Sequence, residues 1–351
     1  MKRNRILLPV LAVAGLFALA MGCSDDDSPG NNNNQVQVCN NDGVCDTADG
    51  ENAVNCAADC VVTCTLSGIS GTAHDFLVSE LYIPDSSTTA KENGVDLNGD
   101  GVIDNKLGSI ISLIASQGGD FDVNESVNAE IQEGSLLLIG RVVVDQFVND
   151  DQVLAQVLQA VVVGGATPIF DGNDEVALNP DAPDDLFLCG RIVNNVLEAG
   201  PSNLAIVFPI AEIGTLDITL ERAQLIGQVT EAGMVDVMLG GGLSKEEIET
   251  NLYPTVLEYL NGEIEADPTG SMATIVLDLL DDNCEPTLPG CDPAPAGCAE
   301  DQEIHVDELK CNALLNSALA PDVDIDGDGT KDLISLGLKI VSAVPVTVVT
   351  Q

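Results

Sequence analysis

Between residues 135 and 241 the chain is an almost unbroken series of short apolar segments separated by Gly, Asn and Pro. Six of them follow one another: SLLLIGRVVVDQF, VLAQVLQAVVVGG, LFLCGRIVNNV, LAIVFPIAEI, TLDITLERAQLIGQV and MVDVMLGG. In the fifth, apolar residues mostly alternate with polar ones, which is typical of an antiparallel sheet with one face in water. We therefore predict a mainly β body with some α structure, an antiparallel β-sandwich or a barrel.

Three or four helices are expected beside this sheet. The segment HDFLVSELYIP (74–84) predicts a further strand, and LISLGLKIVSAVPVTVV (333–349) predicts one or two closing strands. Apolar residues recur at helical spacing in four other places. These are NKLGSIISLIAS (105–116), DVNESVNAEIQEG (122–134, capped by Asp122 and ended by Gly134), SKEEIETNLYPTVLEYLNG (244–262, kinked at Pro254) and VDELKCNALLNSAL (306–319).

The charge of the chain restricts its partners. There are 57 Asp+Glu against 12 Lys+Arg, a net charge of −45, although hydrophobic residues still make up 45% and can form a large core. Such a surface repels nucleic acid and anionic lipid headgroups and attracts divalent cations. Aromatic residues are only 3%, with no Trp, so stacking platforms for sugars or bases are scarce.

The N-terminus has the pattern of an export signal. A basic MKRNR is followed by ILLPVLAVAGLFALAM, and this apolar run is shorter than the ~20 residues that a membrane span needs. The sequence AMGC at Cys23 resembles the lipobox of bacterial lipoproteins. That resemblance implies a signal peptide at 1–22, lipidation of Cys23, a tether at 23–35, and an outer-membrane protein that is exposed at the surface or faces the periplasm. The membrane partner would then be reached through the lipid anchor only.

The cysteines agree with export. The chain has 11, and removing Cys23 leaves an even ten, enough for up to five disulfides in an oxidising compartment. Residues 36–64 resemble the short Cys-rich modules of myxobacterial-type secreted proteins and precede a β-rich domain at 65–351. The disulfide candidates are Cys39, Cys45, Cys56, Cys60, Cys64, Cys189, Cys284, Cys291, Cys298 and Cys311.

Two acidic loops share one pattern, GVDLNGDGVID (94–104) and DVDIDGDGTKD (322–332). They place oxygen ligands at positions 1, 3, 5, 7 and 9 with Gly at 6, the spacing by which an EF-hand loop binds Ca²⁺. The predicted ligands are Asp96, Asn98, Asp100, Val102 (carbonyl) and Asp104, and Asp324, Asp326, Asp328, Thr330 (carbonyl) and Asp332.

These loops resemble EF-hand-like and thrombospondin type 3 calcium loops through position 9. Both depart at position 12, where the acidic ligand is replaced by Leu107 and Ser335. The missing oxygens would come from Glu92, Asp322, another segment or water. We expect two weak structural Ca²⁺ sites, with dissociation constants on the order of 10⁻⁴–10⁻³ M. The alternative is that Asp, Asn and Gly simply form good turns here.

No pattern in the chain indicates catalysis. The two histidines, His74 and His305, stand alone, no G-x-S-x-G or P-loop spacing occurs, and GGGLSKE (240–246) suggests a turn before a capped helix. We expect a non-catalytic, calcium-stabilised lipoprotein with a structural, adhesion or binding role, whose further partner is a surface protein. The alternatives are a carrier of a lipid or small apolar ligand, and an unrecognised secreted hydrolase.

Overall fold

The computed structural model describes residues 69–115, 122–180, 182, 186–210, 214–281, 283–325 and 327–350. The predicted signal peptide, Cys23, the tether and the Cys-rich module with Cys39, Cys45, Cys56, Cys60 and Cys64 lie outside the described residues, as does Asp326. Among the helices of the described residues, none is both long enough and apolar enough to cross a membrane.

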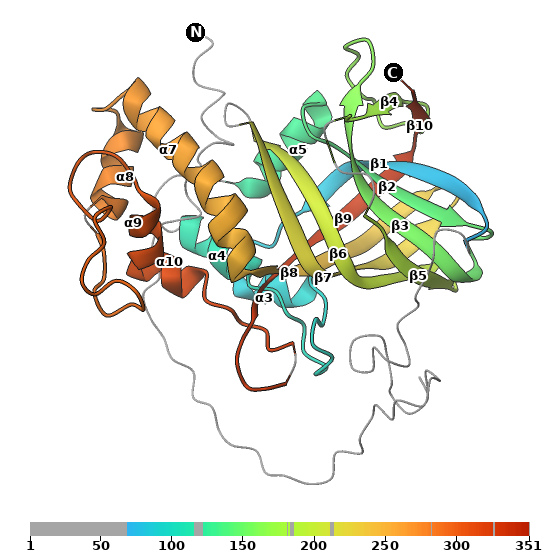
Figure 1. The fold of residues 1–351 in the computed structure, drawn as a ribbon. Helices are drawn as coiled ribbons and strands as arrows, with labels where there is room; N and C mark the ends of the chain where they lie inside the picture. Colours follow the sequence, from blue (N-terminus) through green and yellow to red (C-terminus); the bar gives the residue numbers. More distant parts are fainter. Residues whose placement is uncertain are drawn as a thin grey trace.

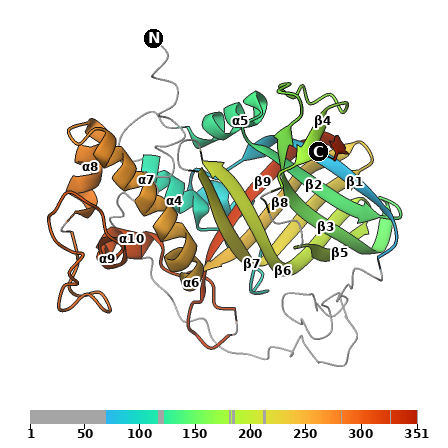
Figure 2. The ribbon, with the colours of Figure 1, turned by 45° about the horizontal axis from the view of Figure 1, so that its top comes forward.

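Eight antiparallel strands close into a barrel (Figures 1 and 2). In chain order they are β1 (Thr72–Tyr82), β2 (Leu137–Val144), β3 (Asn149–Val162), β5 (Leu188–Val193), β6 (Val196–Ile210), β7 (Gly214–Thr230), β8 (Gly233–Ser244) and β9 (Leu333–Pro345). Each strand pairs with the next in the order β3-β2-β1-β9-β8-β7-β6-β5, and β5 pairs with β3 to close the ring. The mainly β prediction is confirmed, and of the two alternatives the barrel is the one that forms.

The barrel is filled by side chains from every strand. Phe76 and Val78 of β1, Met234 of β8 and buried apolar residues of the other six strands belong to one hydrophobic cluster. Gly140 of β2 leaves room for this packing, because a Cβ there would lie 2.6 Å from the Met234 sulfur. Ile218 and Leu220 of β7 are buried in this cluster, as alternation predicts, and a bulge between Glu221 and Gln224 keeps Ala223 and Leu225 on the same face.

Strands β1, β2 and β3 are buried on both faces. On the outer side Leu77, Ile139 and Leu158 form a second cluster with Val176 of the short strand β4 (Glu175–Leu178). Strand β4 pairs with β3 and, in parallel, with β10 (Thr347–Val349). This double burial explains why these strands have continuous apolar runs instead of alternation.

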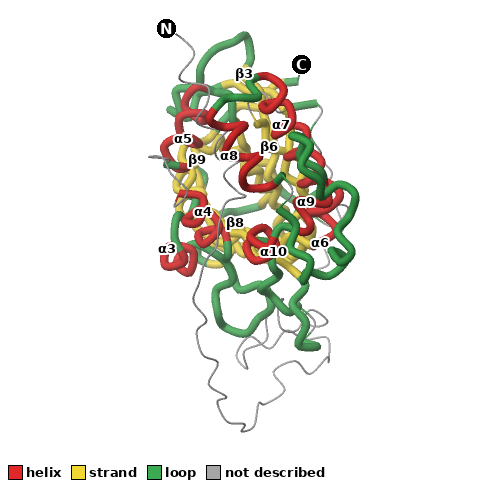
Figure 3. Tube along the Cα trace, turned by 90° about the vertical axis from the view of Figure 1, so that its left-hand side faces the viewer, coloured by secondary structure: helices red, strands yellow, loops and turns green. Residues whose placement is uncertain are grey.

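Helices gather at one end of the barrel, seen end-on in Figure 3. They are α3 (Ser87–Glu92), α4 (Leu107–Ala115), α5 (Val123–Glu133), α6 (Lys245–Glu247), the π-helical turn η4 (Ile248–Leu252), α7 (Tyr253–Ala266), α8 (Ser271–Leu280), α9 (Val306–Cys311) and α10 (Ala313–Ala318). This is more than the three or four expected. The sequence prediction missed α3 and α8, and the helix expected over 306–319 is divided at Asn312, which caps α10.

Two helix boundaries follow the sequence closely. Asp122 accepts hydrogen bonds from the first amides of α5, and Gly134 ends the helix in the left-handed conformation.

Before Pro254 the helix takes the wider π-helical form in η4, where the Tyr253 amide donates a hydrogen bond to the Ile248 carbonyl. The glycine run 240–242, expected as a turn, instead belongs to strand β8. Because these glycines have no side chain, other segments can approach the strand closely there.

Two disulfides, Cys284–Cys298 and Cys291–Cys311, cross-link the Pro-rich segment 284–298 that follows α8, which we call the stapled segment. The second bond joins the segment to α9, and all four cysteines are among the predicted disulfide candidates. Cys189 of β5 is also disulfide-bonded.

Candidate metal centre

The first acidic loop is held by its own carboxylates. The two Asp96 oxygens accept hydrogen bonds from the amides of Gly99 (2.6 Å) and Gly101 (2.8 Å). One Asp104 oxygen accepts from the amide of Leu97, at 2.8 Å. The carboxylates at positions 1 and 9 thus fix the conformation of the loop through hydrogen bonds from its own amides.

The second loop repeats these bonds residue for residue. The two Asp324 oxygens accept from the amides of Gly327 (2.7 Å) and Gly329 (2.8 Å). One Asp332 oxygen accepts from the amide of Ile325, at 3.0 Å. Two segments more than 200 residues apart in the sequence therefore adopt the same loop.

The glycines of the two loops also agree. Gly99 and Gly101 have φ of 79° and 85°, and Gly327 and Gly329 have φ of 75° and 89°. These left-handed conformations are costly for residues with a Cβ, so glycine at positions 4 and 6 is a backbone requirement of the loop. Position 6 is where the EF-hand loop requires its turn.

Position 5 is equivalent in both loops as well. Asp100 accepts a hydrogen bond from the amide of Val102 (2.8 Å), and Asp328 accepts from that of Thr330 (2.6 Å). Asn98 at position 3 bonds to the Asp100 amide. Its counterpart Asp326 lies outside the described residues.

The loops are neighbours on the outside of the barrel. Val95 and Leu97 of the first loop form one buried cluster with Val323 and Leu333 beside the second, and we call this group the loop cluster. The amide of Lys106 donates to the carbonyl of Ser335, at 3.0 Å, so the two loop exits also share a backbone hydrogen bond.

The loop cluster packs against β8 at Gly240. A Cβ at Gly240 would lie 2.3 Å from a methyl carbon of Val95, so any larger residue there would displace the first loop. The acid spacing alone did not show that the loops pack together. The signal was present, however, because an apolar residue stands at positions 0 and 2 of both loops: Val95 and Leu97, Val323 and Ile325.

At position 12 neither loop has an acid. Leu107 is the first residue of α4, and Ser335 lies in β9. The Asp322 carboxylate accepts hydrogen bonds from the Ser335 amide (2.8 Å) and hydroxyl (2.5 Å). Of the expected sources of extra oxygen, Asp322 thus lies beside position 12, and Glu92 ends α3 with an exposed side chain.

Burial raises the pKa of Asp104 to about 6. The hydrogen bond from the Leu97 amide opposes this shift, and the carboxylates of Asp100, Asp96 and Asp322 add to it. Asp322 belongs to the second loop, so the negative charges of the two loops repel one another. A cation bound among them would relieve this repulsion.

Asp104→Asn is expected to change stability in opposite directions with and without calcium. The folded pKa lies above the unfolded value, so ionisation of Asp104 destabilises the metal-free fold: the penalty is absent below about pH 4 and complete above about pH 6. Asn keeps an acceptor for the Leu97 amide and removes the charge. In EGTA at pH 7 we expect a gain of about 1 kcal/mol, discounted for partial exposure.

Because Asp104 is a predicted calcium ligand, the same variant should instead be less stable than the wild type in millimolar calcium. Urea unfolding at pH 7, in EGTA and in calcium, checks both signs. A loss of stability in both conditions would contradict this account of Asp104.

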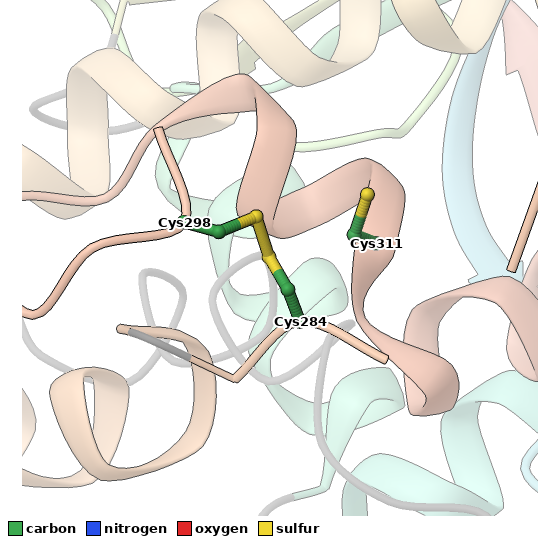
Figure 4. A group of neighbouring side chains, drawn as sticks. All are labelled: Cys284, Cys298 and Cys311. Carbon is green, nitrogen blue, oxygen red and sulfur yellow. A yellow bond between two sulfur atoms is a disulfide. The ribbon is translucent and has the colours of Figure 1, made fainter. Parts of the chain in front are cut away.

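Hard oxygen donors suit Ca²⁺, but the loop carboxylates are turned toward loop amides. Among the described residues, one group of three potential ligand atoms within 4.8 Å of one another is found, the sulfurs of Cys284, Cys298 and Cys311 (Figure 4). Cys284 and Cys298 are bonded to each other and Cys311 is bonded to Cys291, so these sulfurs are held in disulfides. Each hydrogen-bonded carboxylate oxygen keeps a second lone pair. The residues therefore fit a calcium ion chemically, and binding would require some of these side chains to turn.

The two histidines have structural positions. His305 is the N-cap of α9: its amide donates to Glu308 at 2.8 Å, and its Nε2 lies 3.1 Å from Asp301. His74 packs edge-on against Phe147, with ring centroids 4.8 Å apart. Among the described residues, neither histidine belongs to a group of three potential metal ligands.

A cavity of about 390 Å³ lies between the stapled segment and the start of α7. Across it, Lys310 forms a 2.6 Å ion pair with Glu249, which lowers the pKa of that carboxyl. Burial and the Glu249 charge raise the pKa of Tyr253 to about 12. Lys310 and Tyr253 can donate hydrogen bonds at this cavity, and Glu249 can accept them.

In comparisons with known proteins, no family model matches this chain, and neither the curated proteins nor the solved structures give a match.

Proposed function

We propose that this protein is an exported, calcium-stabilised lipoprotein with a non-catalytic structural, adhesion or binding role. Calcium would be held in each loop by the residues at positions 1, 3, 5, 7 and 9. The observation that carries the proposal is the repetition of one loop, with the same carboxylate–amide bonds and the same left-handed glycines, at two places that meet on the barrel.

A pair of ordinary turns has no need for this repetition. An Asn side chain could accept the single loop-amide bonds made at positions 5 and 9, yet these loops keep a carboxylate at positions 1, 5 and 9 in both copies despite the repulsion that raises the pKa of Asp104. Without an acid at position 12 the affinity would be weak, on the order of 10⁻⁴–10⁻³ M. Calcium outside a cell is abundant enough to occupy such sites permanently.

The packed barrel supports a scaffold over a carrier. Interior side chains from all eight barrel strands belong to one cluster, and the 390 Å³ cavity lies at the edge of it, bordered by Ile248, Tyr253 and Ile334. A surface protein or small ligand would then be bound by the outer surface.

Isothermal titration with Ca²⁺ tests the proposal. We expect two weak sites in the wild type and one in each of the variants Asp96→Asn and Asp324→Asn, since each removes the charge at position 1 of one loop. The absence of any calcium-dependent heat up to 10 mM would rule the proposal out.

The proposed anchor is tested separately. The N-terminal peptide of the purified protein should begin at Cys23 and carry the mass of a diacylglyceryl group, and Cys23→Ser should leave the protein out of the membrane fraction. An unmodified Cys23 in membrane-bound protein would exclude lipidation.

A further inference from the structure

We propose that Arg222 of β7 is a built-in counter-charge of the first loop, which stabilises the loop without metal and weakens its binding of calcium. This inference rests on the proposed calcium function and adds a determinant of affinity outside the loop itself. Arg222 would act on the loop residues and would not be a ligand.

The side chain reaches the start of the loop. Its Nε donates a hydrogen bond to the carbonyl of Leu97, at 2.8 Å. Two residues further along β7, the Gln224 amide donates to the carbonyl of Asp96, at 3.2 Å. The backbone carbonyls at positions 1 and 2 of the loop thus accept hydrogen bonds from one neutral and one charged side chain of β7.

A bulge in β7 directs Arg222 toward the loop. The pairing of β7 with β8 shifts register between Glu221 and Gln224, and Arg222 has a φ of 52°, in the left-handed region. Ala223, between the two donors, is fully buried in the barrel cluster. Left-handed backbone at a non-glycine residue persists where the surroundings enforce it, and bulges commonly re-aim a side chain.

The charge of Arg222 is unusual at this place. The chain has 12 Lys+Arg against 57 Asp+Glu, and this guanidinium is half-buried beside an acidic loop. Burial lowers the pKa of Arg222, and the Asp96 carboxylate opposes that shift, so the two charges attract each other. The neutral side chain of Gln224 also donates a hydrogen bond to a loop carbonyl, so attachment of the loop to β7 does not require a positive charge.

A fixed positive charge beside the first loop has two effects. It offsets the repulsion among Asp96, Asp100 and Asp104 when no metal is bound. It also repels an incoming divalent ion, and this repulsion weakens with salt. The first loop would therefore stay folded at low calcium, and its affinity would depend on ionic strength.

The test compares Arg222→Gln with Arg222→Lys in the full chain. Gln keeps a hydrogen-bond donor without the charge, whereas Lys keeps the charge. Arg191→Gln is the matched control, since it removes the same charge from β5, where Arg191 pairs with Glu198. Calcium titrations at about 20 mM and about 500 mM salt are combined with melting curves in EGTA.

We expect Arg222→Gln to tighten one of the two sites by about three- to tenfold at low salt, and by less at high salt. In EGTA the same variant should melt earlier than the wild type. Arg222→Lys and Arg191→Gln should leave the affinity close to that of the wild type.

Equal weakening of calcium binding in Arg222→Gln and Arg222→Lys would overturn the proposal, because it would assign Arg222 to docking alone. An unchanged affinity in Arg222→Gln at both salt concentrations would overturn it as well. If the wild type itself bound no calcium, the proposed function would fail, which is a distinct result.

Discussion

Excess EGTA is expected to lower the melting temperature by about 10 °C relative to the same protein in 10 mM calcium. With a dissociation constant of about 10⁻⁴ M, each occupied site adds about 2.7 kcal/mol to the free energy of unfolding. Two sites give about 5 kcal/mol, and a chain of this size shifts by about 2 °C for each kcal/mol. Differential scanning calorimetry measures the shift directly.

The matched control is the double variant Asp96→Asn with Asp324→Asn, which keeps an oxygen acceptor at position 1 of both loops. It should melt at the same temperature in calcium and in EGTA. If the wild type also melted at one temperature in both conditions, calcium would have no structural role in this protein.

Leu97→Ala is expected to lower the free energy of unfolding by about 3 kcal/mol, even without calcium. Leu97 is a loop residue but its side chain is 0% exposed, in the loop cluster with Val95, Val323 and Leu333. Its removal leaves a cavity between the loops. Urea unfolding in EGTA measures this loss without a contribution from metal.

Val102→Ala provides the comparison for Leu97→Ala. Val102 is in the same loop, five residues away, and its side chain is 58% exposed, so its truncation should change stability by less than about 0.5 kcal/mol. Comparable effects of the two substitutions would show that the loops do not pack as the loop cluster requires.

Much of the barrel could be predicted from local sequence. Alternation along β7 and the apolar runs of β2 and β3 identify strands, since each depends on the burial of one or both faces of the strand itself. Closure of the sheet could not be predicted. It depends on pairs such as Leu154 with Cys189 and on the insertion of β9 between β1 and β8, and no local pattern encodes contacts so distant in sequence.

In the candidate site, too, local features could be predicted from the sequence, whereas contacts between distant segments could not. The acid and glycine spacing predicted how Asp96 and Asp324 would sit within their own loops, because those bonds span only a few residues. The approach of the loops to each other could not be deduced from spacing. It follows from the place of β9 beside β8, which brings the second loop next to the first across Gly240.

A crystal structure determined from protein in 10 mM calcium tests the central claim most directly, through the anomalous scattering of the ion. One anomalous peak is expected in each loop, within about 2.6 Å of the oxygens at positions 1, 5 and 9. Two loops without a peak, with their carboxylates still bonded to the loop amides alone, would contradict it.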